Sequence, residues 1–358
     1  MKNKGECTLK KLRIGLLGSG FVQNFHMESY REISQAEVVA VASRNPKHVK
    51  KFARKWGIKT TYSDEDFIEK LCSDPNVDVV DIGIPNFLHM KAAITAAENH
   101  KNVICEKPLG RNTKEAQKMV KAVEKYGVLH AYAENELFSP HNVKAKEFID
   151  SGAIGKVIWV RSREAHFGPH SQWFWNKKLA GGGCIVDMGC HSIEAARFFI
   201  GKERKPLEVF AWTATLVHGD RTDAEDNSLT LVKYEGDALA QSENSWAAHG
   251  GLDHRFEIHG TDGAIFLNPT RETGMKVFTV APEKKVGYVI EKAEVMKGWL
   301  LPLWGEYLIY GYYPELKHFI ESFLKDELPR ETFHDGLIVN RIMDAAYKSA
   351  KSGKWVKL

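Results

Sequence analysis

Apolar segments alternate with helical segments along the first part of the chain, between residues 12 and 133. The segments Leu12–Leu17 and Val77–Ile84 are short and rich in Val, Ile and Leu, as is typical of strands buried on both faces. Two further stretches, Pro46–Trp56 and Thr113–Tyr126, have the pattern of amphipathic helices. The alternation predicts an α/β fold in which helices cover both faces of a parallel, Rossmann-type sheet.

A glycine-rich turn follows the first of these strands. Gly18 stands where the chain must turn tightly, and Gly20 stands where a bare backbone can approach a pyrophosphate at a helix N-terminus. The third glycine of the dinucleotide-binding fingerprint is replaced by Gln23, so an ordinary glycine turn is the alternative. The residues expected to hold a cofactor here are Gly18, Ser19, Gly20, Phe21 and Val22.

The end of the second predicted strand, Val38–Ala42, is where an NAD-binding protein usually carries an acid for the ribose hydroxyls, ~20 residues past the glycine turn. Here the positions hold Ser43 and Arg44. A hydroxyl beside a guanidinium suits a 2′-phosphate better than a ribose diol, because arginine forms charge-assisted hydrogen bonds with phosphate. A solvated arginine is the alternative. The cofactor is therefore expected to be NADP or NAD, with a slight preference for NADP.

A lysine follows the apolar run Val103–Cys105. Glu106 and Lys107 come directly before Pro108, which ends regular strand pairing. The charge of Lys107 is therefore expected at the carboxyl end of a buried strand, where open α/β sheets bind their ligands.

The pattern changes after Ala133, where the predicted strands become longer and alternate. Runs of this kind predict a mainly antiparallel open sheet with one packed and one free face. We expect a Rossmann domain over residues 1–138 and a C-terminal α+β domain for substrate binding and oligomerisation over residues 139–358, closed by two helices near Pro314–Leu324 and His334–Ser352. The predicted strands are Lys156–Ala165, Leu207–Val217, Asn227–Tyr234, Ala238–Ser245, His254–Gly260, Gly263–Leu267 and Met275–Val280.

A second dense motif lies at residues 181–201. Its three consecutive glycines, residues 181–183, permit a close backbone approach. Asp187 and His191 are four residues apart, so on a helix they share one face, where a carboxylate can orient an imidazole for acid/base work. The alternative is that Asp187 caps the helix and that His191 only contacts a backbone carbonyl.

Taken together, these motifs resemble the Gfo/Idh/MocA family of nicotinamide-dependent oxidoreductases over nearly the whole chain. The resemblance is carried by Gly18-Ser-Gly20, Ile84-Pro85-Asn86-Phe-Leu-His89, Glu106-Lys107-Pro108, and the three glycines with Asp187-x-Gly189-x-His191, in the family's order and spacing. The chain departs from the family at Gln23, at Ser43, and at Glu134-Asn135-Glu136, where many relatives carry an arginine. The last difference bears on substrate recognition.

The resemblance implies a catalytic group formed by Lys107, Asp187 and His191. It places Pro85, Asn86, His89 and Glu106 beside the nicotinamide and its ribose, and it implies a homodimer or homotetramer assembled through the C-terminal sheet.

The expected chemistry is hydride transfer between the nicotinamide and a secondary hydroxyl or ketone of a sugar, glycoside or cyclitol. His191 would move the hydroxyl proton, Lys107 would stabilise the alkoxide, and Asp187 would hold both; no metal is needed. One alternative is a glycosidase that oxidises a sugar at C3 with tightly held cofactor. Another is a non-catalytic cofactor-binding regulator, although such a protein has no use for this acid/base group.

Aromatic and imidazole side chains precede the second motif. Flat aromatic faces with polar neighbours suit a carbohydrate, whose ring stacks while its hydroxyls form hydrogen bonds. The alternative is that some of the aromatic residues at 173–175 are core. Trp246, His249 and the stretch 299–313 are weaker candidates. The residues expected to bind substrate are His166, His170, Trp173 and Trp175.

Charge and cysteine content exclude several classes of function. The 50 basic and 46 acidic residues are interspersed, so neither nucleic acid nor a membrane surface is expected as a partner. No apolar run approaches the ~20 residues of a membrane helix, and a cytoplasmic location is expected. The five cysteines have no C-x-x-C spacing, so neither a disulfide framework nor a zinc ribbon is expected. A small carbohydrate or polyol is the expected partner.

Overall fold

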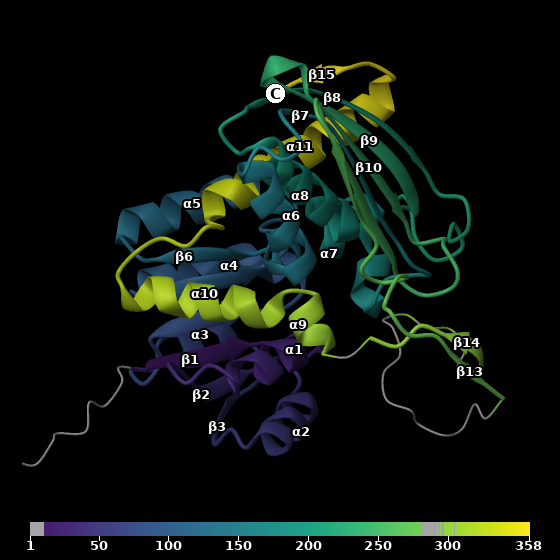
Figure 1. Cartoon of the computed structure of the whole chain (residues 1–358). Helices are drawn as coiled ribbons and strands as arrows, with labels where there is room; N and C mark the ends of the chain where they lie inside the picture. The colour runs from purple at the N-terminus through teal and green to yellow at the C-terminus, as the bar shows by residue number, and fades with distance from the viewer. Residues whose placement is uncertain (1–10, 281–291, 293, 295–296, 304) are drawn as a thin grey trace, which may run out of the picture.

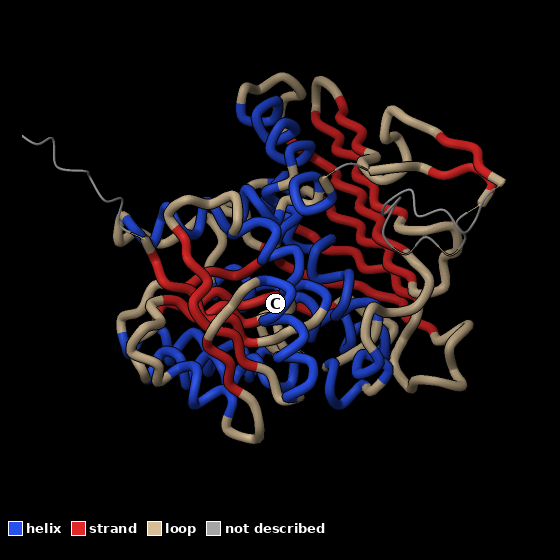
Figure 2. Tube along the Cα trace, turned by 90° about the horizontal axis from the view of Figure 1, so that it is seen from below, coloured by secondary structure: helices blue, strands red, loops and turns tan. Residues whose placement is uncertain are grey.

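The computed structural model describes residues 11–280, 292, 294, 297–303 and 305–358, and it has two sheets with helices packed around them (Figure 1). Figure 2 shows the strands of the two sheets as separate groups, one beside the other. Of the predicted features, Cys7 and Trp304 lie outside the described residues. The four described cysteines are buried and free. Among the described helices, none combines the length and apolar character needed to cross a bilayer.

The first sheet has six strands in the order β3-β2-β1-β4-β5-β6, and every pair in it is parallel. This is the doubly wound order that the alternating pattern predicts. Its strands are β1 (Leu12–Leu17), β2 (Ala36–Ala42), β3 (Thr60–Tyr62), β4 (Val79–Ile82), β5 (Asn102–Glu106) and β6 (His130–Ala133). Its helices are α1 (Phe21–Tyr30), α2 (Pro46–Trp56), α3 (Phe67–Cys72), α4 (Asn86–Glu98) and α5 (Thr113–Tyr126).

The second sheet has seven strands in the order β12-β11-β7-β10-β9-β8-β15. Only β7 and β10 pair in parallel, so the predicted mainly antiparallel sheet is confirmed. Its strands are β7 (Val157–Ala165), β8 (Pro206–Ala214), β9 (Asn227–Tyr234), β10 (Leu239–Ser245), β11 (Asp253–Gly260), β12 (Ala264–Leu267) and β15 (Val356–Lys357). The strands β13 (Val277–Thr279) and β14 (Gly298–Leu300) form a separate antiparallel pair that lies beyond it (Figure 1).

The remaining helical elements connect and cover the sheets. One face of the second sheet packs against α8 and α11, while the other carries exposed apolar side chains that include Trp212 and Phe266. These elements are η1 (Asn135–Phe138), α6 (Pro140–Asp150), η2 (Gln172–Trp175), α7 (Lys177–Ala180), the π-helix η3 (Ile185–Gly189), α8 (Cys190–Ile200), η4 (Glu235–Asp237), α9 (Glu306–Ile309), α10 (Tyr312–Leu324) and α11 (Phe333–Ser352).

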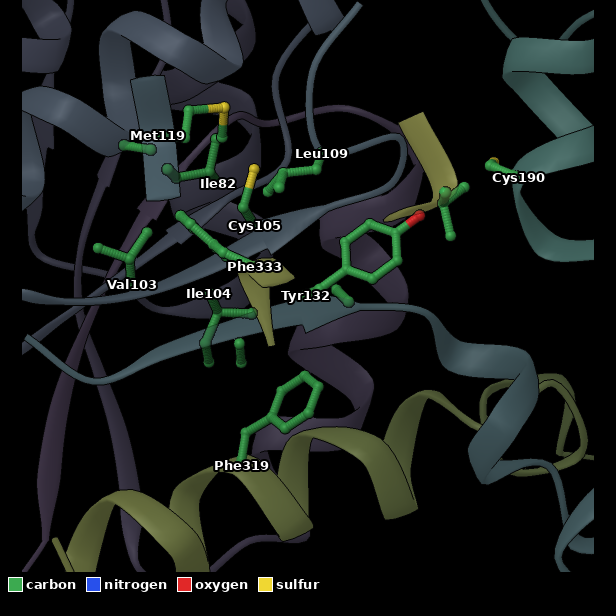
Figure 3. Packing of buried hydrophobic residues seen from close by; sticks show 14 of the residues in the cluster. Ile82, Val103, Ile104, Cys105, Leu109, Met119, Tyr132, Cys190, Phe319 and Phe333 are labelled. Carbon is green, nitrogen blue, oxygen red and sulfur yellow. The ribbon is translucent and has the colours of Figure 1, made fainter. Parts of the chain in front are cut away.

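The two C-terminal helices return to the Rossmann sheet. Helix α10 packs against α1, and α11 contacts α5, β6 and β8 (Figure 1). Phe319 of α10 and Phe333 of α11 pack in one core with Ile104 of β5 and Tyr132 of the edge strand β6 (Figure 3). The boundary between residues 138 and 139 stays a prediction.

Candidate active site

A cavity of about 490 Å³ lies at the carboxyl ends of the Rossmann strands. Its wall combines the turn after β1 and the ends of β4 and β5 with η1, the end of β7 and η3. Two predicted site residues, Arg44 and Trp175, are outside its lining. The predicted residues that line it are Gly18, Ser19, Gly20, Phe21, Val22, Ser43, Pro85, Asn86, His89, Glu106, Lys107, His166, His170, Trp173, Asp187 and His191.

The glycine turn has the shape that a dinucleotide phosphate needs. Gly18 has a φ of +118°, and a Cβ there would lie 2.2 Å from the carbonyl oxygen of Gly83, so only glycine fits. Gly20 precedes α1, and a Cβ there would enter open space. No side chain caps α1 and its first turn has no acid, so its N–H groups are available to a pyrophosphate.

Gln23 takes a structural role in place of the missing third glycine. Its side chain is buried, and Nε2 donates a hydrogen bond to Oδ1 of Asp81 at 3.1 Å. The departure from the fingerprint therefore ties α1 to β4 and leaves the phosphate turn intact.

The structure places the two predicted ribose-site residues, Ser43 and Arg44, in different surroundings. Ser43 lines the cavity, together with His48. Arg44 is largely exposed and donates a hydrogen bond to Glu65 Oε1 at 3.0 Å. A 2′-phosphate would have to compete with Glu65 for this guanidinium.

Asn86 and His89 connect segments of the cavity wall. Asn86 Nδ2 donates to the carbonyl of Ala180 at 2.9 Å. The two ring nitrogens of His89 lie 2.7 Å from the Ile84 carbonyl and 3.0 Å from the Pro108 carbonyl. These contacts join the segments after β4 and β5 to α7 and hold this part of the wall in place.

Lys107 spans the two halves of the cavity. Its Nζ donates to the backbone carbonyl of Asp187 at 2.6 Å and lies 3.6 Å from Oδ1 of the same residue. Burial alone would lower the pKa of Lys107, but nearby negative groups, Asp187 and Glu164 among them, outweigh burial and raise it. Lys107 is therefore a fixed positive charge at the centre of the site.

The carboxylate that contacts His191 is Glu134, not Asp187 as the sequence predicts. Nδ1 of His191 is hydrogen-bonded to Oε1 of Glu134, at the end of β6. Asp187 Oδ2 instead accepts a hydrogen bond from Trp246 Nε1 at 2.8 Å. The physical reason is that Ile185–Gly189 form a π-helix, whose wider turn does not align residues four apart.

The Glu134–His191 pair can hold a proton. Burial, reinforced by the charge of Lys107, lowers the pKa of His191 to about 4. Burial and the neighbouring Glu136 raise the pKa of Glu134 well above its usual range. With Nδ1 engaged by Glu134, the second ring nitrogen, Nε2, is the one left for a substrate.

Two further carboxylates line the cavity, although they are not among the predicted site residues. Glu136 Oε2 lies 3.1 Å from Nε2 of His254, and Glu164 stands at the end of β7. Glu134, Glu136 and His191 also place one ligand atom each within 4.8 Å of one another, but Glu134 and Glu136 already contact histidine nitrogens. The sequence signal for these acids is their position directly after β6 and at the end of β7.

The predicted substrate wall is largely assembled. His170 stacks on Phe21 with centroids 4.8 Å apart, and Trp173 stacks on Phe174 at 3.8 Å. Trp175 is turned away, against Trp246 at 5.6 Å. Of the weaker candidates, Trp246 is fully buried, His249 lies 2.7 Å from Glu294 and Trp299 is exposed, whereas Tyr310 and Tyr312 line the cavity.

A glycine turn at the start of a Rossmann helix and a lysine–histidine group across a shared cavity define a dinucleotide-dependent oxidoreductase. Family models agree: residues 12–133 match the oxidoreductase family with an NAD-binding Rossmann fold, and residues 142–266 match the Gfo/Idh/MocA C-terminal domain. The chain belongs to the Gfo/Idh/MocA family of oxidoreductases, and its N-terminal domain is the family's NAD-binding domain.

Relatives match over nearly the full length. The chain is 29% identical to levoglucosan dehydrogenase of Pseudarthrobacter phenanthrenivorans, over 97% of this chain and 98% of that protein. It is 28% identical to myo-inositol 2-dehydrogenase of Thermotoga maritima, with the same coverage. Among solved structures, GenD2 from gentamicin A biosynthesis in complex with NAD superposes with a TM-score of 0.90, at 28% identity and covering 100% of this chain and 99% of that chain.

Proposed function

We propose that the protein transfers hydride between a nicotinamide cofactor and a secondary hydroxyl, or the corresponding ketone, of a sugar, glycoside or cyclitol. The observation that carries the proposal is the meeting of Lys107 and His191 in the cavity that the glycine turn opens into. Support comes from the relatives, which are named as dehydrogenases of levoglucosan and myo-inositol.

In this proposal each residue has one task. Bound nicotinamide would accept or return the hydride. His191 takes the hydroxyl proton at Nε2 during oxidation, while Glu134 holds the ring through Nδ1. Lys107 Nζ stabilises the alkoxide oxygen, and Asp187 fixes Nζ through its backbone carbonyl. Trp246 holds the Asp187 carboxylate.

The preference for NADP inferred from Ser43 and Arg44 belongs to this proposal. It requires that Arg44 exchange Glu65 for a 2′-phosphate, which is feasible because both side chains are mostly exposed and such pairs contribute little stability. Neither Arg44 nor Glu65 lines the cavity.

We also propose self-association through the outer face of the second sheet. Trp159, Trp212, Leu229 and Phe266 are exposed on it, and the register places them on the side away from the helices. Exposed large apolar side chains on one sheet face are typical of subunit interfaces. Light scattering of the purified protein measures the oligomeric state.

The proposed activity is tested by the absorbance of the reduced nicotinamide. Levoglucosan, myo-inositol, scyllo-inositol and D-xylose are added one at a time to the protein with NAD or NADP. A rise with at least one compound, absent from the His191→Ala variant, is the expected result. No rise with any polyol, and no loss of reduced cofactor with the matching ketoses, would contradict it.

A further inference from the structure

The cavity is rich in carboxylates. Of the described residues that line it, Glu106, Glu136, Glu164 and Asp187 are acidic, Lys107 is the sole lysine and none is an arginine. Asp187 is matched by Lys107. Glu136 lies in η1, directly after β6, and Glu164 lies at the end of β7.

Among the described residues, none forms an ion pair with Glu164, whereas Asp187 and Glu136 each have such a partner. It is only 7% exposed, and its Oε2 is buried without a hydrogen bond. In the sheet it stands opposite His254 of β11 and Asn244 of β10, so the three side chains share the inner face. His254 pairs with Glu136, and Asn244 donates its amide hydrogen to Ser192 Oγ at 3.0 Å. These two neighbours of Glu164 in the described sheet therefore supply no cation to it.

Most of the charged groups around Glu164 are negative and disfavour its ionised form. Burial, together with the charge of Glu136, raises the pKa of Glu164, and Asp187 and Glu134 act in the same direction. Lys107 opposes them but is held on Asp187. A buried carboxyl of this kind is stabilised as a charged group only when a cation reaches it.

We infer that the substrate is an amino sugar or aminocyclitol whose protonated amine binds between Glu136 and Glu164. The inference rests on the proposed function for the position of the ring, since the oxidised hydroxyl must lie at Lys107 and His191. An ammonium offers three donors to two carboxylates and brings a positive charge to Glu164. A hydroxyl can donate only one hydrogen bond and brings no charge.

The test compares binding of three matched probes to the protein loaded with NADH, by isothermal titration calorimetry. Glucosamine carries the amine, glucose has a hydroxyl at the same carbon, and N-acetylglucosamine has an uncharged amide there. Two further pairs place the amine at other positions. These pairs are kanosamine with glucose, and scyllo-inosamine with scyllo-inositol. We expect at least one amine to bind about tenfold to a hundredfold more tightly than its hydroxyl partner, the range for hydrogen bonds to a charged group.

Single substitutions test whether Glu136 and Glu164 cause the preference for the amine. Glu164→Gln and Glu136→Gln should each remove most of the preference for the amine without weakening NADH binding. Glu243→Gln, on the outer face of the same sheet, is the matched control and should keep the preference. Thermal melting confirms that each variant is folded, and two independent variants keep the test valid if one is not.

Three outcomes would overturn the inference: equal or tighter binding of every hydroxyl partner, an unchanged preference in both folded variants, or no binding of any amine. Turnover of neutral polyols with no amine preference would overturn the inference and leave the proposed function standing. Binding of an amine without turnover of any compound would overturn the proposed function and leave the amine site between Glu136 and Glu164 standing.

Discussion

Lys107 Nζ donates a hydrogen bond of 2.6 Å to the backbone carbonyl of Asp187, eighty residues further along the chain. One residue follows a Rossmann strand and the other lies in the π-helix of the second layer. The contact fixes the ammonium by a group that cannot titrate, and the raised pKa of Lys107 keeps it charged throughout the neutral range. The positive charge of the site is therefore independent of pH under ordinary assay conditions.

Replacing this lysine tests its role. Lys107→Ala should lower kcat by about 10²–10³-fold, because the alkoxide loses its electrostatic partner. Steady-state kinetics measures the loss, and Lys91→Ala, which removes an exposed lysine paired with Glu69, should have no effect. Turnover at the normal rate in Lys107→Ala, with none in His191→Ala, would show that the lysine has a different function.

The contact between Glu134 and His191 leads to a second prediction. His191→Ala should reduce kcat by about 10²–10⁴-fold, the usual contribution of a general acid/base. Glu134→Gln should give a smaller loss that appears in kcat more than in KM, because the ring keeps a neighbour at Nδ1 but loses the carboxylate. Asp187→Asn is the comparison: if it disturbs His191 more than Glu134→Gln does, the imidazole is oriented by Asp187 after all.

The pH profile follows from the pKa of His191. Oxidation requires His191 to be neutral, and its pKa is lowered to about 4, so the competent form is already complete well below pH 6.5. Titration of His191 itself should therefore leave kcat/KM for oxidation flat from pH 8 down to about 5. Glu134 must also be ionised to accept the Nδ1 proton, and its pKa is raised, so a fall above pH 5 should disappear in Glu134→Gln. A fall centred near 6.5 that persists in Glu134→Gln would be inconsistent with this environment of His191.

The preference between NADP and NAD can be tested at the exposed ion pair of Arg44 and Glu65. Arg44→Ala should raise the Kd for NADP by about tenfold or more and leave the Kd for NAD nearly unchanged, because only NADP carries the 2′-phosphate. Glu65→Gln should tighten NADP binding by freeing the guanidinium. Fluorescence titration gives both constants. Equal losses for the two cofactors in Arg44→Ala would make Arg44 a surface residue without a role in selection.

Gly183 carries a prediction about stability. A Cβ at this position would lie 1.9 Å from the carbonyl oxygen of Glu225, which is backbone and cannot move aside. Gly183→Ala should therefore lower the free energy of unfolding by about 3 kcal/mol or more, measured by urea titration. Gly219→Ala is the control, since its nearest atom, on Thr215, is 3.9 Å away. Equal stability of the two variants would exclude the close approach.

The Rossmann half of the fold could be predicted because its signals are local. The helices α2 and α5 have the predicted bounds, since Asn45 and Asn112 cap their starts and Gly57 and Gly127 end them. Strands β3 and β15 were missed because they are short and depend on pairing with β2 and β8. Short strands of this kind have little periodicity to detect.

The site was predicted only in part, because some of its contacts join residues that are far apart in the sequence. The spacing of Asp187 and His191 gave a pair on an α-helix, but a π-helix is a departure that residue spacing does not reveal. The actual partner, Glu134, is 57 residues away, so a single sequence cannot connect the two. The sequence singled out the loop of Glu134 and Glu136 as a departure from the family, but it did not reveal the contacts of these acids with His191 and His254.

The return of α10 and α11 to the first sheet has a consequence for how the protein is made. Backbone bonds join Tyr132 N to the Glu331 carbonyl, and Phe319 and Phe333 fill the core beside β5 and β6 (Figure 3). A nascent chain that has passed only residue 138 lacks these side chains and exposes the apolar surface they cover. The core beside β5 and β6 is therefore completed only by residues from α10 and α11, which the ribosome makes last.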